Sequence, residues 1–260
     1  MNAGHRLLDL LLGRLCVFCG NAVSFRAEAS ICPICKKETA VEPLHFSGMG
    51  LEHIQSLYPY TNLVRQGIHR YKLGGIADLG RFAAHRMAQK YKNDGKTVDL
   101  VTCVPSNWKR KRDYNQSELL AKYFAKEVGL PFEPYLLVKK SHVKSQTACR
   151  NRRERIGNAK NVYRLNCPKE KIEEKRILIL DDVITTGATL ASCAEQLLAA
   201  GATQVRAYTI AATIALPPPK LLLSGKNLSP HRNIPRQFTA PKGTVQKIQE
   251  QNVLFFKSPT

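Results

Sequence analysis

The segment RILILDDVITTGATLASCAEQLLAAGATQVRAYTIAAT, residues 176–213, constrains the fold more than any other part of the chain. Its aliphatic start predicts a strand buried on both faces, and a loop rich in threonine and glycine follows. A helix comes next, and Gly201 stands where the end of that helix needs a residue that adopts positive φ. A second apolar strand closes the segment. This strand–helix–strand order predicts a parallel sheet with helices on its faces.

Other segments extend the same pattern on either side. FAAHRMAQKY and SELLAKYFAKEVG have the apolar spacing of helices, and VDLVTCVP predicts another buried strand. We therefore expect an α/β domain over residues 46–216. Residues 1–45 are rich in cysteine and lack a sustained period, which predicts a small metal-stabilised module. Beyond LPPPK, residues 217–260 carry few acids and no clear helical period, and we expect a basic, disordered tail.

The N-terminal cysteines have the spacing of a metal site. Two C-x2-C pairs are separated by twelve residues, and together they contain Cys16, Cys19, Cys32 and Cys35. Four thiolates with no open position favour a tetrahedral, structural Zn²⁺ site. The alternative is that the four thiols are free or form disulfides. A reducing compartment disfavours the disulfides. His45 and His53 lie nearby in the sequence but lack the spacing of ligands.

The charge of the chain indicates which partners it attracts. Lys and Arg number 40 against 20 Asp and Glu, which gives a formal net charge of +20. Such a field concentrates polyanions, whether nucleic acid, nucleotides or sugar phosphates, and charge alone does not choose among them. The sequence contains no apolar run of eighteen residues and no convincing signal peptide, so we expect no transmembrane segment and a cytoplasmic location.

The loop after the first strand has the features of a phosphate-binding site. The strand Ile177–Leu180 places Asp181 and Asp182 at its carboxyl end, where ligands bind in open α/β sheets. The glycine in VITTGAT lets backbone N–H groups approach an anion, and the helix beginning near Ala188 adds its N-terminal dipole. Carboxylates would repel a phosphate but accept hydrogen bonds from sugar hydroxyls, which indicates a ribose 5-phosphate. The alternative is that these Asp and Thr side chains only cap and solubilise a turn.

The stretch ILILDDVITTGATL resembles the phosphoribosyl pyrophosphate (PRPP) motif of type I phosphoribosyltransferases. The whole arrangement, over about residues 10 to 216, resembles the competence protein F (ComF) family, also called ComFC or GntX-like. The resemblance implies a type I phosphoribosyltransferase-like α/β fold. It also implies that Asp181 and Asp182 hold the ribose hydroxyls, and that the loop wrapping the 5-phosphate consists of Thr185, Thr186, Gly187, Ala188 and Thr189.

Two basic segments also match the family. VPSNWKRKRDYNQSELLA contains an uninterrupted basic run that could contact pyrophosphate: Lys109, Arg110, Lys111 and Arg112. SQTACRNRRERIGNAKNVY resembles the family's mobile hood, in which Arg155 would meet the same polyanion. Each segment could instead be a solvated charged loop or a nonspecific nucleic-acid contact. Where the family usually has glycine before [FY]-N-Q, this chain has Asp113, which adds a negative charge near the expected anion. Lys72 could also reach an anion.

Two functions are compatible with these features. As an enzyme, the protein would transfer 5-phosphoribosyl from PRPP, with Mg²⁺ bridging pyrophosphate and ribose, to an acceptor that the sequence does not name. Its catalytic residues would be unknown. As a binding protein, it would use the PRPP fold as a nucleotide-sensitive adaptor, and the family resemblance implies a part in DNA uptake during natural competence. Single-stranded DNA and proteins of the competence machinery would then be its partners.

Overall fold

The computed structural model describes six stretches of the 260-residue chain: residues 14–23, 30–73, 78–95, 97–106, 115–140 and 162–213. Contacts divide the chain into two units, Met1–Leu221 and Leu222–Thr260, and all described residues belong to the first. The predicted tail and the basic run lie outside the described residues, as does the hood except for its last two residues, 162 and 163.

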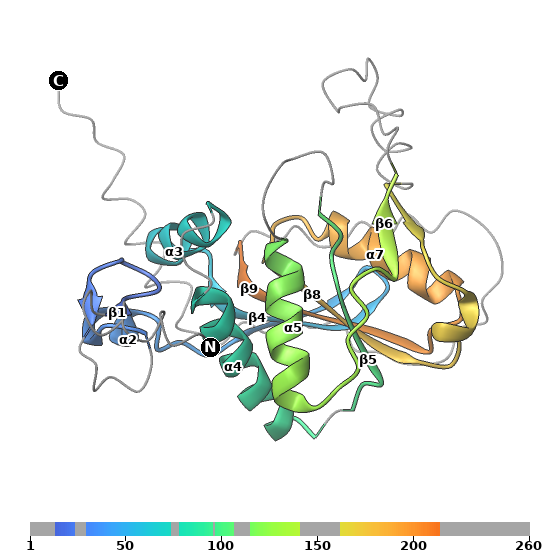
Figure 1. Cartoon of the computed structure of the whole chain (residues 1–260), viewed down its shortest axis with the longest axis horizontal. Coiled ribbons are helices and arrows are strands. Elements are labelled where there is room, and N and C mark those ends of the chain that lie inside the picture. The colour runs from blue at the N-terminus through green and yellow to red at the C-terminus, as the bar shows by residue number, and fades with distance from the viewer. Residues whose placement is uncertain are drawn as a thin grey trace, which may run out of the picture. The chain divides into compact units, whose positions relative to one another are not determined.

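A five-stranded sheet forms the centre of the first unit (Figure 1). Its strands, in spatial order, are β3 (Leu44–Gly48), β4 (Leu51–Pro59), β9 (Gln204–Ala212), β8 (Arg176–Ile184) and β5 (Leu100–Cys103). Neighbours pair in parallel except at the edge, where β3 runs antiparallel to β4. The carboxyl ends of the four parallel strands therefore meet at one edge of the sheet, as the sequence predicted for its strands.

Helices cover both faces of the sheet. The buried cluster on one face includes residues of α3 (Asn62–Lys72), α4 (Asp78–Asn93) and α5 (Gln116–Val128), and the cluster on the other face includes α7 (Ala188–Ala199). A smaller antiparallel pair, β6 (Leu137–Lys139) with β7 (Tyr163–Leu165), and the short 3-10 helix η2 (Lys169–Lys171) complete this part of the chain. Within the described stretches, no helix has both the length and the apolar character to cross a membrane.

Strand β8 shows why an unbroken aliphatic run is suited to the middle of this sheet. Ile177 and Ile179 pack in one cluster and Leu178 and Leu180 in the other, and none is more than 1% exposed. Successive side chains of a strand point to opposite faces, so apolar residues are needed at every position. The strand also continues beyond the run to Ile184, paired with β9 throughout. The two acids therefore lie within the strand, which continues two residues past them.

The cysteine-rich segment packs on the face of the sheet that α3, α4 and α5 cover. It contains the short strands β1 (Arg14–Leu15) and β2 (Ala22–Val23) and the helix α2 (Pro33–Glu38). The Phe18 ring lies edge-on to Tyr58 of β4, with 5.5 Å between ring centroids. Gly67 of α3 allows the close approach, because a Cβ there would lie 2.9 Å from the Val17 carbonyl oxygen. The segment and the sheet thus share one buried core.

Candidate functional site

The turn between β8 and α7 forms an exposed loop at the carboxyl edge of the sheet. Thr185, Thr186, Ala188 and Thr189 are exposed, while Gly187 is buried. Gly187 precedes the first residue of α7 and has φ +76°, a conformation that glycine adopts without steric cost. The Thr186 hydroxyl oxygen accepts a long hydrogen bond from the Ala188 N–H, 3.4 Å away. We call residues 185–189 the phosphate loop.

The phosphate loop lines a small depression together with the first of the two acids, and residues 183, 184 and 190 complete the lining. The first turn of a helix has backbone N–H groups without helical partners, and its dipole favours an anion. Exposed threonine residues and a helix N-terminus therefore line the same small space. This arrangement is chemically suited to a phosphate group.

Asp181 lies in β8 beside the phosphate loop and accepts two hydrogen bonds on one carboxylate oxygen. The Ser117 hydroxyl donates to Oδ1 over 2.8 Å, and the Asp182 backbone N–H donates to the same atom over 2.9 Å. Burial and the negative charge of Asp182 nevertheless raise the pKa of Asp181 to about 7, because desolvation outweighs these donors. Asp181 is thus an acid that can change its protonation state near neutral pH.

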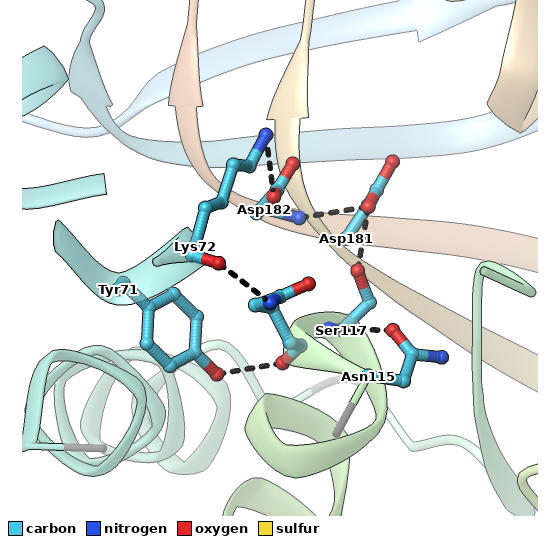
Figure 2. A network of polar contacts seen from close by, with 7 residues as sticks. Tyr71, Lys72, Asn115, Ser117, Asp181 and Asp182 are labelled. Atoms are coloured by element: carbon cyan, nitrogen blue, oxygen red, sulfur yellow. Dashed lines mark hydrogen bonds and ion pairs between the residues drawn. The ribbon is translucent and has the colours of Figure 1, made fainter. Parts of the chain in front are cut away.

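Asp182 has a cationic partner in the same place. Its Oδ2 atom lies 2.7 Å from the Lys72 ammonium, and its side chain is 13% exposed against 38% for Lys72. Figure 2 shows Lys72 reaching Asp182 while Ser117 contacts Asp181. The Lys72 carbonyl accepts a hydrogen bond from the Gln116 side-chain amide, 3.3 Å away, and the Tyr71 hydroxyl donates to the Gln116 carbonyl over 2.6 Å. The end of α3 and the start of α5 are therefore fixed to each other next to both acids.

The local sequence explains how α5 begins at this point. Asn115 caps the helix, and its side-chain oxygen accepts the Ser117 N–H over 3.1 Å. Asn is among the preferred N-cap residues, so the helix start was predictable from NQSELLA. The contact between Ser117 and Asp181 was not predicted, because it joins residues that are 64 positions apart. The only signal in the sequence is a serine in the first turn of a helix that follows a strand's carboxyl end.

The structure thus brings together the predicted ribose acids and the predicted phosphate loop. It adds Ser117, which sequence reasoning missed, and it places Lys72 as a partner of Asp182. The predicted pyrophosphate cations Lys109, Arg110, Lys111, Arg112 and Arg155 lie outside the described residues, as does Asp113.

The four N-terminal cysteines form the one group of candidate metal ligands found among the described residues. Their sulfur atoms lie within 4.8 Å of one another. The Cys19 and Cys32 sulfurs are 3.8 Å apart, close to the separation of about 3.8 Å expected for ligands at about 2.3 Å from a tetrahedrally bound metal. Burial opposes ionisation of Cys16, but backbone donors led by Cys32 lower its pKa to about 7. The cluster could therefore hold a metal ion.

Arg70 places a buried cation beside the cysteine cluster. Its Nε and Nη2 atoms are buried and have no hydrogen-bond partner among the residues that the structure describes. The guanidinium also lies against the first cysteine pair, since a Cβ at Gly20 would be 3.1 Å from Nη1. A divalent metal with four thiolates has a net negative charge, which would compensate the buried cation. The donor set and its surroundings therefore fit a tetrathiolate metal site.

Comparison with known proteins agrees with this architecture. The family model described as "Phosphoribosyl transferase domain" matches residues 76–224, more than half of the chain. The "DNA utilization protein YhgH" of Salmonella typhimurium is 28% identical over 77% of this chain and 91% of its own length. The "Competence protein F" of Haemophilus influenzae is 28% identical over 75% of this chain and 83% of its own.

Among solved structures, the glutamine PRPP amidotransferase from B. subtilis covers 76% of this chain and 34% of that longer chain, with 23% identity. Its TM-score of 0.38 is too low to add to the argument. The family assignment rests on the family model and the curated relatives, and the parallel sheet agrees with it. The chain belongs to the phosphoribosyl transferase domain family and is a ComF-type member of it, with an N-terminal cysteine cluster that could bind a metal.

Proposed function

We propose that this protein binds PRPP, or a related ribose 5-phosphate compound, at the carboxyl end of β8 and takes part in DNA uptake. One observation carries the first half of the proposal. Asp181 and Asp182 lie next to an exposed loop that has hydroxyls, a left-handed glycine and a helix N-terminus. Acids would hold the sugar hydroxyls and the loop would hold the phosphate, so the two halves of a ribose 5-phosphate meet complementary groups.

The chemistry of each acid follows from its contacts. Asp181 is held by Ser117, which leaves its second carboxylate oxygen for a ribose hydroxyl. Asp182 is neutralised by Lys72, and a second hydroxyl would replace that ammonium as the donor. Mg²⁺, if it accompanies PRPP, supplies positive charge to the pyrophosphate oxygens. Without that cation, the negative charges of the ligand and of the two carboxylates would repel each other.

The relatives support the second half of the proposal. Proteins named for DNA utilization and for competence align with most of this chain. The net charge of +20 is favourable for binding single-stranded DNA, since cations near the strand release its counterions. The proposed partners are therefore single-stranded DNA and proteins of the competence machinery. The metal proposed for the cysteine cluster is structural Zn²⁺, because four clustered thiolates favour it.

Calorimetry with PRPP and Mg²⁺ on the metal-loaded full chain tests the ribose-phosphate site. We expect saturable binding that disappears in the double variant Asp181→Asn and Asp182→Asn. Glu195→Gln serves as a control, because Glu195 is an exposed acid on α7 outside the site. Binding that survives in the double variant would contradict the assignment of the acids to ribose.

The same double variant separates the sugar-phosphate site from DNA binding. Fluorescence anisotropy with a labelled single strand should give an affinity that is unchanged or higher, because two negative charges are removed. A loss of DNA affinity in a folded double variant would show that the acids do not act as proposed.

The family to which the chain belongs favours a second function, which is transfer of the 5-phosphoribosyl group. In that reaction an acceptor nucleophile bonds to C1 of the ribose, the bond from C1 to oxygen breaks, and pyrophosphate leaves. Release of pyrophosphate from PRPP in the presence of candidate acceptors, lost in the double variant, would establish it. Saturable PRPP binding without any release would leave the protein as a binding protein.

A further inference from the structure

The turn between β3 and β4 has a backbone that its sequence does not favour. Gly48 pairs with Leu51, so the turn consists of Met49 and Gly50. Both have positive φ, +59° and +78°. Two-residue hairpin turns with two positive φ values strongly prefer Asn-Gly, Asp-Gly or Gly-Gly. Methionine is sterically disfavoured at the first position, since its Cβ crowds the backbone in this region.

In this conformation the side chain of Met49 lies beside Gly187 of the phosphate loop. A Cβ added to Gly187 would lie 2.5 Å from the Met49 sulfur, so the thioether occupies the space beside this glycine. Met49 is partly buried and packs against the cluster that contains Ile184 and Leu190, the residues just before and just after the phosphate loop. A long, unbranched and flexible side chain is well suited to filling such an irregular space.

The turn is also held against the helix that follows the phosphate loop. A Cβ at Gly50 would lie 3.5 Å from Leu198 and 3.9 Å from Ala194, both on α7. The turn therefore lies beside the second half of α7 at Gly50 and beside the phosphate loop at Met49. The paired strands β3 and β4 hold this turn next to a loop that is itself exposed.

We propose that Met49 is a positioning residue for the phosphate loop, whose thioether packs against Gly187 and holds the backbone of residues 186–189 in the conformation that receives a phosphate. This inference rests on the proposed ribose 5-phosphate site. Local backbone strain that the surrounding structure maintains is concentrated at functional sites, where it is part of the mechanism. Met49 occupies a turn position that prefers Asn, Asp or Gly, and it contacts the candidate site, so it fits that pattern.

The variant Met49→Asn tests the idea, because it improves the turn and removes the thioether. Asn-Gly is the preferred pair for this turn, so the melting temperature should stay the same or rise. Affinity for ribose 5-phosphate, measured by calorimetry on the metal-loaded full chain, should fall by about tenfold or more, a fall equivalent to about 1.4 kcal/mol. Met49→Leu, which keeps apolar volume beside the glycine, should bind within about threefold of wild type.

A matched control lies at the neighbouring position. Gly50→Asn changes the same turn, but its side chain would meet α7 and not the loop. It should leave ribose 5-phosphate affinity unchanged. A melting temperature that falls by several degrees in both Met49→Asn and Met49→Gly would instead identify Met49 as a core residue and overturn the inference.

A measurement without ligand separates this inference from the proposed function. Backbone NMR order parameters for residues 186–189 should be near 0.85 in the wild type and fall toward about 0.6 in Met49→Asn. Unchanged order parameters together with unchanged affinity would overturn the role of Met49. If wild-type protein binds neither PRPP nor ribose 5-phosphate, the proposed function fails, and the order parameters alone then decide whether Met49 positions the loop.

Discussion

The substitution Asp181→Asn should make the protein more stable than wild type at alkaline pH, although it should weaken the binding of the proposed ligand. The pKa of Asp181 is raised from its ordinary 3.8 to about 7 by burial and by the charge of Asp182. At pH values between these two pKa values, Asp181 holds a proton in the folded protein that it has released in the unfolded chain. The free energy of unfolding consequently falls as the pH rises from about 4 to about 7, and it does not recover above pH 7. Asparagine has no proton to lose.

The size of the effect follows from the pKa itself. Each pH unit inside that window changes the free energy of unfolding by up to about 1.4 kcal/mol for one proton. Between pH 5 and pH 8, wild-type protein should therefore lose about 3 kcal/mol that Asp181→Asn does not lose. The amide oxygen of asparagine can still accept from the Ser117 hydroxyl and the Asp182 N–H, so the surrounding contacts remain.

Urea denaturation of both proteins at several pH values between 5 and 8.5 measures this difference. The quantity of interest is the difference between the two unfolding free energies at each pH, because groups far from Asp181 titrate equally in both proteins. It should grow by about 3 kcal/mol toward high pH. A difference that is independent of pH, or one that shrinks as the pH rises, would refute the reasoning about the burial of Asp181.

Three further changes have expected outcomes. Gly80→Ala places a Cβ 2.6 Å from the Tyr71 hydroxyl oxygen, and the overpacking should lower the free energy of unfolding by about 1–3 kcal/mol in urea; an unchanged midpoint would contradict this packing. Ile177→Ala should cost about 2–5 kcal/mol because this side chain is fully buried, yet a folded sample should bind PRPP within about twofold of wild type. Cys19→Ser or metal chelation should lower the melting temperature, since the unfolded cysteine segment would uncover apolar surface around Phe18; a chelator without effect would argue against a bound metal.

The sequence was most informative where a single local pattern decides the structure. The aliphatic run of β8 has to be buried on both faces, and Gly201 does have positive φ, +99°, after α7. The cysteine spacing correctly predicted a cluster, because two short C-x2-C segments can bring four sulfurs together over a short distance. In each case the residues that determine the feature lie within a few positions of one another.

Features that depend on distant contacts were not predictable in this way. The β3–β4 turn has Met-Gly in place of the usual Asn-Gly signal, so the hairpin gave no clear pattern. The extension of β8 to Ile184 depends on its pairing with β9 as far as Ala212, which the sequence of β8 alone does not contain. The ion pair of Lys72 with Asp182 likewise requires α3 to end above the sheet, and that is decided by packing.

The helix α3 has a consequence for how experiments on this family member should be designed. Its Gly67 packs against the cysteine segment, while Lys72 at its end contacts an acid of the candidate site. Deleting the N-terminal segment would uncover the buried side of α3 and disturb Lys72 at the same time. A loss of ligand binding in a truncated protein would therefore not distinguish the removed cysteine segment from the disturbed Lys72 contact. Paired point substitutions, one in the cysteine cluster and one at Lys72, can assign a phenotype to either region.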